Sequence, residues 1–66
     1  MNLTVNGEKK NLPDGATVRR LLIELGLEHS PVAVEVNRKI VRRGDQEGLA
    51  LSDGDTVEVV HFVGGG

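Results

Sequence analysis

The sequence predicts an α+β fold, in which a mixed sheet of four to five strands packs on one α-helix. Apolar and polar residues alternate in short segments near both ends and in the middle of the chain, as they do in half-buried strands. A single stretch beginning at Val18 instead repeats its apolar residues at helical spacing. The chain has 66 residues and no cysteine, so we expect one domain held together by packing and hydrogen bonds.

The first segment predicts a β-hairpin. Residues 2–6 alternate polar and apolar, and the Asn6-Gly7 pair favours a tight turn with positive φ at both central positions. A short, lysine-rich return strand over residues 8–12 suits the edge of a sheet. The Pro-Asp-Gly sequence at residues 13–15 supplies the turn that closes this unit.

A helix is predicted to begin after Thr17, whose hydroxyl is a good N-cap. The apolar residues that follow lie at positions i, i+3, i+4 and i+7 and form one stripe, made of Val18, Leu21, Leu22 and Leu25. Gly26 stands where helices often end in a left-handed residue, and Leu27 is placed to fold back on the last turn.

Three more strands are predicted, at residues 32–36, 39–43 and 56–63. Between the last two, a polar loop leads to Leu49 and Leu51, and both side chains are expected to enter the core. The last strand is the most apolar segment, as expected of a strand with neighbours on both sides.

The order of these elements favours one topology. Because a helix lies between the first strand and the last, these two strands can run parallel at the centre of the sheet. This is the β-grasp, or ubiquitin-like, architecture, which we assign to residues 1–63. Residues 64–66 are three glycines and are expected to form a flexible tail.

Composition excludes several classes of function. A net charge of -2 and a single aromatic residue argue against nucleic-acid binding, which needs a basic surface and stacking rings. No apolar run is long enough to span a membrane, and the first residues do not resemble a signal peptide, so a cytoplasmic location is expected. The chain is also too short to build a catalytic cleft easily.

One interpretation of the glycines at 64–66 is a reactive end. A carboxylate on a thin arm can enter a deep cleft of another protein, where transfer of AMP from ATP turns it into an electrophile. A persulfide sulfur or an amine can then displace AMP, and a side chain near the end would crowd that reaction. The glycines alone fit an inert, unstructured end or a cloning scar equally well.

The chain ends with Val57-Glu58-Val59-Val60-His61-Phe62-Val63-Gly64-Gly65-Gly66. With this ending, the whole chain resembles the ThiS family of sulfur-carrier proteins of thiamine biosynthesis. The most specific part of the resemblance is the closing stretch, residues 53–66. The other matching segments are Val5-Asn6-Gly7, Thr17-Val18, Leu21-Leu22, Val32 to Asn37, Ile40-Val41 and Arg43.

This resemblance implies a reaction sequence for Gly66. An E1-like, ThiF-type enzyme would adenylate it with ATP, and sulfur from a cysteine desulfurase would convert it to a thiocarboxylate. Thiazole synthase, of the ThiG type, would accept the sulfur, with Gly64 and Gly65 entering the partners' active sites. The chain would then be a co-substrate rather than an enzyme. It has no phosphate-binding Gly-Lys-Ser/Thr loop, so we expect no bound cofactor and place ATP on the partner.

Three other functions remain open from the sequence. A molybdopterin-synthase-type sulfur carrier has the same fold and a similar end. A ubiquitin-like modifier would form amide bonds to lysines of other proteins. A binding module with an inert tail would keep its function after loss of Gly65 and Gly66.

The last strand predicts a docking patch. Glu58, Val60 and Phe62 share one face of it, opposite Val57 and Val59. Because Glu58 belongs in water, Val60 and Phe62 are expected on the face away from the helix, where a partner would dock. A bulge near the end of the strand would instead reverse the register and bury Phe62.

The remaining polar residues point to no site. His29 and His61 are far apart and lack a metal-binding motif, so no metal site is expected, and Asp53-Gly54-Asp55 is interpreted as a turn. The basic residues fit a solvated surface, with docking to an acidic partner as the alternative. They are Arg19, Arg20, Arg38, Lys39, Arg42 and Arg43.

Overall fold

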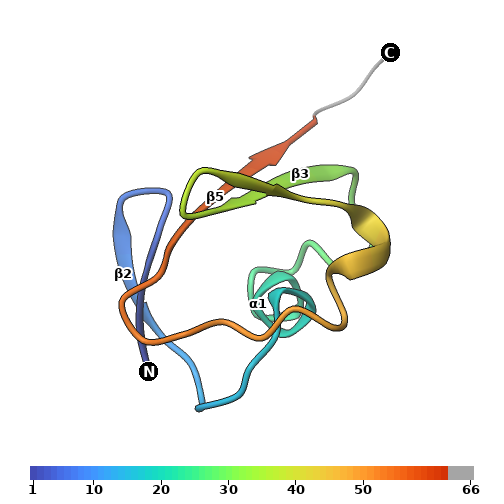
Figure 1. Ribbon diagram of the computed structural model, residues 1–66. Helices are drawn as coiled ribbons and strands as arrows, with labels where there is room; N and C mark the ends of the chain where they lie inside the picture. Colours follow the sequence, from blue (N-terminus) through green and yellow to red (C-terminus); the bar gives the residue numbers. More distant parts are fainter. Residues whose placement is uncertain (63–66) are drawn as a thin grey trace.

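The computed structural model describes residues 1–62, which form a five-stranded sheet with one helix beneath it (Figure 1). The elements are β1 (Asn2–Val5), β2 (Glu8–Asn11), α1 (Val18–Glu24), β3 (Val32–Val36), β4 (Lys39–Val41), the 3₁₀ turn η1 (Arg43–Asp45) and β5 (Thr56–His61).

The strand order is β2-β1-β5-β3-β4, so β5 is the central strand. β1 and β5 run parallel, with Thr4 opposite Thr56 and Val5 opposite Val57. The other neighbouring strands are antiparallel. The predicted β-grasp topology is confirmed, with five strands in the sheet.

The helix begins and ends where the sequence predicts. The Thr17 hydroxyl accepts a hydrogen bond of 3.2 Å from the backbone N–H of Arg20, which caps the first turn. Gly26 has φ of 73°, and the N–H of Leu27 donates to the carbonyl of Leu22 at 2.8 Å. This left-handed ending satisfies carbonyls of the last turn and directs the chain back toward the sheet.

The core lies between α1 and the inner face of the sheet. It joins residues of every strand except β2 to the apolar stripe of the helix. Its buried members are Leu3, Val5, Leu12, Ala16, Val18, Leu21, Leu22, Val34, Val41, Leu51, Val57 and Val59.

Truncating the centre of this core is expected to unfold much of the protein. Leu21 is fully buried, so Leu21→Ala should lower the free energy of unfolding by about 2–5 kcal/mol. A domain of this size has only about 3–5 kcal/mol from its core. Urea titration measures the loss, and Ile23→Ala is the control on the same helix, because Ile23 is exposed. Similar losses in both variants would contradict this placement of the core.

Two local predictions were wrong. Leu49 is exposed rather than buried, because it lines an open groove with Val36 and Val41 and its side chain meets solvent there. The strand predicted at residues 39–43 ends at Val41, and the polar loop after it begins with η1. Leu51 is buried as predicted.

Candidate functional site

The exposed face of β5 carries the predicted docking residues. Val57 and Val59 point into the core, with exposed fractions of 0% and 7%. Val60 and Phe62 are 55% and 57% exposed, so both lie on the opposite side from the core. The predicted register therefore holds through Phe62, and no bulge reverses it. That a partner docks on these residues stays a prediction.

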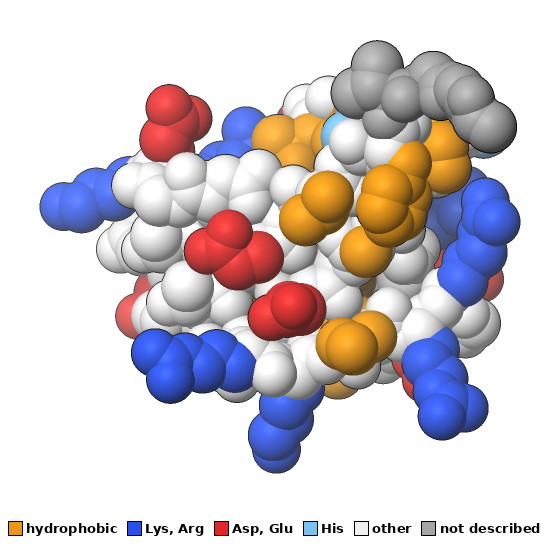
Figure 2. Space-filling view, turned by 90° about the horizontal axis from the view of Figure 1, so that it is seen from above, with side chains coloured by type: hydrophobic (Ala, Val, Ile, Leu, Met, Phe, Trp, Pro, Cys, Tyr) orange, Lys and Arg blue, Asp and Glu red, His pale blue; other side chains and the backbone are white. Residues whose placement is uncertain are grey.

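Neighbouring strands extend this apolar surface. Val60 lies opposite Ala33 of β3, and the N–H of Phe62 donates to the carbonyl of Pro31 at 3.0 Å. Ile40 of β4, which lies opposite Glu35, is 78% exposed. We call Val60, Phe62 and Ile40 the outer-face patch. Figure 2 shows hydrophobic side chains gathered on this surface of the molecule.

Ile40 was missed as a site residue by the sequence reasoning. The exposure of Ile40 could have been predicted from the alternation of side chains along β3 and β4. Val34 of β3 lies opposite Val41 of β4, and both are buried. The next residue on each strand must point outward because side chains alternate. Glu35 and Ile40 are those residues.

Asn6 has a role beyond the turn that the sequence predicts. Asn6 and Gly7 have φ of 49° and 81°, as expected of a tight hairpin turn. The Asn6 side chain also reaches β5, where its Oδ1 accepts from the N–H of Val59 at 2.8 Å. Its Nδ2 donates to the carbonyl of Val59 at 3.1 Å. One side chain therefore satisfies both backbone groups of a residue near the end of β5.

Asn37 makes a similar contact at the start of β5. Its φ is 51°, and its Oδ1 accepts from the N–H of Thr56 at 3.0 Å. Its Nδ2 donates to Asp55, whose carboxylate also accepts from the backbone N–H of Ser52. Asp53-Gly54-Asp55 is thus a structural turn, as its sequence predicts.

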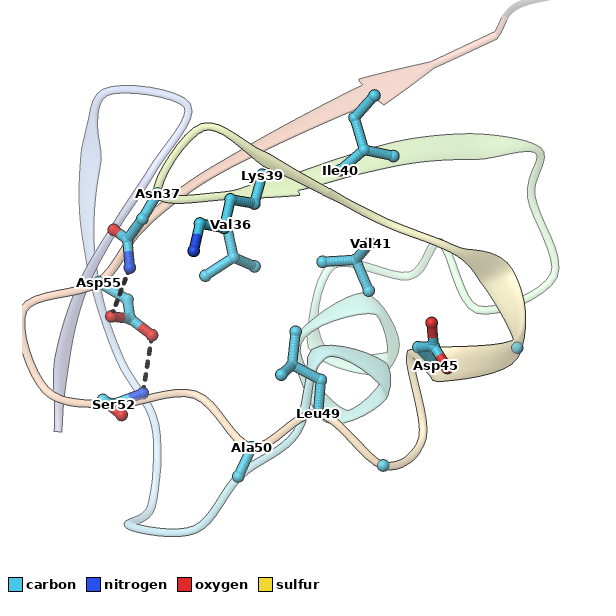
Figure 3. A pocket seen from close by; sticks show the side chains of 12 residues that line it. Val36, Asn37, Lys39, Ile40, Val41, Asp45, Leu49, Ala50, Ser52 and Asp55 are labelled. Carbon is cyan, nitrogen blue, oxygen red and sulfur yellow. Dashed lines mark hydrogen bonds between the residues drawn. The ribbon is translucent and has the colours of Figure 1, made fainter.

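A groove of about 740 Å³ opens beside β4 (Figure 3). Leu49, Ile40 and Val41 form apolar parts of its lining, and the hydrogen-bonded group of Asn37, Asp55 and Ser52 lies at one end. The side chains of Asn37 and Asp55 are therefore engaged in holding the turn.

His29 and His61 are both exposed, and residues 1–62 contain no cluster of potential metal ligands. Of the basic residues, Arg19 lies 3.6 Å from Glu47 and Arg20 lies 3.1 Å from Glu24. Such exposed pairs fit a solvated surface. No helix within the described part of the chain is long and apolar enough to cross a membrane.

Gly64, Gly65 and Gly66 lie outside the described residues, as does the proposed boundary between domain and tail. The structure therefore shows the strand that leads toward them and the surface around its end. The end of β5 and the outer-face patch together form the candidate functional site.

Comparison with known proteins identifies relatives along the whole chain. The ThiS family model matches residues 2–66. The sulfur carrier protein ThiS of Bacillus subtilis is 40% identical over 65 residues, covering 97% of this chain and 98% of the relative. The crystal structure of ThiS from Geobacter metallireducens matches with a TM-score of 0.83 at 36% identity, and each chain is covered completely.

Longer relatives contain a similar segment. A thiazole synthase of Paramagnetospirillum magneticum is 46% identical over 66 residues, which is all of this chain but 20% of the relative. The chain thus spans about a fifth of the length of the thiazole synthases that it matches. The family model, the carrier proteins and the solved structure agree, and the chain belongs to the ThiS family.

Proposed function

We propose that this protein is a sulfur carrier for thiazole formation in thiamine biosynthesis. The observation that supports this most strongly is the similarity to the Bacillus subtilis sulfur carrier, which spans nearly the full length of both proteins. The matching region of the family model also reaches Gly66. In this proposal partner enzymes bind the folded domain, and the carboxylate of Gly66 reacts.

The proposed chemistry begins at the Gly66 carboxylate. One of its oxygens attacks the α-phosphorus of ATP, and pyrophosphate leaves, which gives an acyl adenylate. The terminal sulfur of a persulfide attacks the acyl carbon, and AMP leaves. This step forms a C–S bond and keeps the S–S bond of the persulfide. A thiol then cleaves that S–S bond, taking the inner sulfur of the persulfide into a disulfide and leaving a thiocarboxylate on Gly66. The absence of side chains on Gly64 and Gly65 leaves room for the nucleotide and the attacking sulfur.

The partners follow from this chemistry. A ThiF-type, E1-like enzyme binds ATP and adenylates the carrier, and a cysteine desulfurase supplies the persulfide sulfur. A thiazole synthase of the ThiG type accepts the sulfur. The carrier binds no cofactor and has no catalytic role, so it acts as a co-substrate. The last step consumes a thiol, and thiols stay reduced in the cytoplasm, so we expect the carrier to act there.

The longer relatives support the last of these partnerships. Two proteins named thiazole synthase include a segment similar to this chain. Joining two proteins that react with each other raises their effective concentration. A carrier segment within a thiazole synthase is therefore consistent with direct sulfur transfer between the two.

The outer-face patch is the proposed docking surface. Val60 lies on β5 and Phe62 directly follows that strand, on the way to the reactive end, so a partner bound there receives the end at the same time. Exposed apolar patches of this kind commonly mark protein–protein contacts. An aromatic side chain at the centre of such a contact often contributes much of the binding energy.

Intact-mass spectrometry tests the proposed function. The protein is incubated with ATP, a ThiF-type enzyme, a cysteine desulfurase, cysteine and a thiol. We expect a mass increase equal to replacement of one oxygen by one sulfur, located on Gly66 by fragmentation. An unchanged mass, with partners shown to load a known carrier, would contradict the proposal. Amide-linked conjugates as the main product would indicate a protein modifier instead.

A further inference from the structure

The backbone of β5 is held differently on its two sides. On the β3 side, hydrogen bonds continue as far as Phe62, whose N–H donates to the Pro31 carbonyl. In an antiparallel pair the bonded residues alternate, so the backbone groups of Val57 and Val59 point toward β1 instead. The N–H of Asn6 donates to the Val57 carbonyl at 2.9 Å. β1 itself ends at Val5, and the chain then turns away through Gly7.

The Asn6 side chain fills the place of the missing strand. Its amide bonds both the N–H and the carbonyl of Val59, two groups that would bond two different residues of a parallel strand if β1 continued. Val59 lies three residues before Phe62. β5 is therefore fixed on both sides as far as Val59, and on the β3 side alone beyond it.

We propose that Asn6 is a positioning residue for the sulfur-carrying end. It extends the two-sided support of β5 toward the outer-face patch, and so fixes the direction in which the chain leaves the domain. The inference rests on the proposed function, because the direction matters only if the end must reach a partner's active site. In this inference Asn6 acts through the backbone of β5, which its side chain bonds at Val59.

Asn37 provides a matched control. Both asparagines have positive φ in hairpin turns, and both bond the backbone of β5 with their side chains. Asn37 holds Thr56 at the start of the strand, far from its end. Glycine tolerates the positive φ at either position, so Asn6→Gly and Asn37→Gly remove the hydrogen bonds without straining the turn.

The first test is the backbone mobility of the two variants, measured by NMR relaxation. Rigid backbone has an order parameter of about 0.85, and flexible backbone lies below about 0.6. We expect the amides of His61 and Phe62 to become flexible in Asn6→Gly and to stay rigid in Asn37→Gly. The amide of Val59 should also exchange faster with solvent in Asn6→Gly. Unchanged order parameters of His61 and Phe62 in Asn6→Gly would overturn the inference. This measurement needs no partner enzyme.

The second test is adenylation kinetics, measured as pyrophosphate release at increasing carrier concentration. With the outer-face patch intact, Asn6→Gly should lower kcat by about tenfold, because the end is misplaced in the bound complex. The half-saturating carrier concentration should stay within about twofold, as expected when ground-state binding is unchanged. Asn37→Gly should change neither value. Equal kcat values for the two variants would overturn the inference.

Urea titration shows whether the variants remain folded. If Asn6→Gly unfolds, the kinetic test is made with Asn6→Asp instead. Aspartate tolerates positive φ and keeps an acceptor for the Val59 N–H, but it has no donor for the Val59 carbonyl. Its kcat should fall by about threefold, and wild-type turnover would overturn the inference. A wild-type chain that releases no pyrophosphate would contradict the proposed function instead.

Discussion

Removal of Gly66 is expected to abolish sulfur loading while the domain remains folded. The buried residues of the described chain run from Leu3 to Val59, so the shortened protein should melt at the same temperature. The mass increase that marks the thiocarboxylate should disappear. We expect the rate of pyrophosphate release to fall by more than about 100-fold.

The size of this effect follows from chain geometry. One residue extends a chain by at most about 3.6 Å, so loss of Gly66 withdraws the carboxylate by nearly that distance. A misplacement of about 1 Å in an active site can lower a rate by about 100-fold. The shortened chain also ends in a glycine carboxylate, so its intrinsic reactivity is unchanged. Only position differs between the two proteins.

Two variants test this explanation. An extra glycine after Gly66 moves the carboxylate by the same distance in the other direction and should also block loading. Gly66→Ala keeps the length and adds a methyl group, so it separates crowding from distance. Loading of the shortened chain at the wild-type rate would contradict the assignment of Gly66 as the reactive residue.

Most of the fold could be predicted from local patterns. The Asn6-Gly7 turn, the Thr17 cap and the Gly26 helix end each depend on a preference of one or two residues for a particular backbone conformation. The alternation in β5 is also local, so the exposure of Val60 and Phe62 followed from it. Each of these features can be predicted from neighbouring residues alone.

The errors and omissions arise where contacts join distant segments. Leu49 looks like a core residue because it is apolar, but whether it is covered depends on how closely its loop packs against β3 and β4. Asn6 is a turn residue by sequence, and its bonds to Val59 join residues 53 positions apart. A single sequence contains no local signal for such a pairing. Parallel register between β1 and β5 is needed to find it.

Phe62→Ala is expected to weaken partner binding by about 30-fold, which corresponds to about 2 kcal/mol for an aromatic residue at the centre of an interface. Phe62 is 57% exposed in the isolated domain, so its truncation should change the free energy of unfolding by less than about 0.5 kcal/mol. Titration calorimetry or surface plasmon resonance with the ThiF-type enzyme measures the affinity. Ile23→Ala is the control, because Ile23 is an exposed apolar residue on α1, beneath the sheet.

Kinetics distinguish docking from positioning. If Phe62 contributes only to docking, Phe62→Ala should raise the half-saturating carrier concentration and leave kcat unchanged, because the lost contact stabilises bound carrier and transition state equally. Asn6→Gly should instead lower kcat and leave the half-saturating carrier concentration nearly unchanged. Equal affinities for Phe62→Ala and Ile23→Ala would show that partners bind another surface. A loss of kcat in Phe62→Ala would instead show that the outer-face patch also aligns the reactive end, since a contact that only docks cannot alter turnover at saturation.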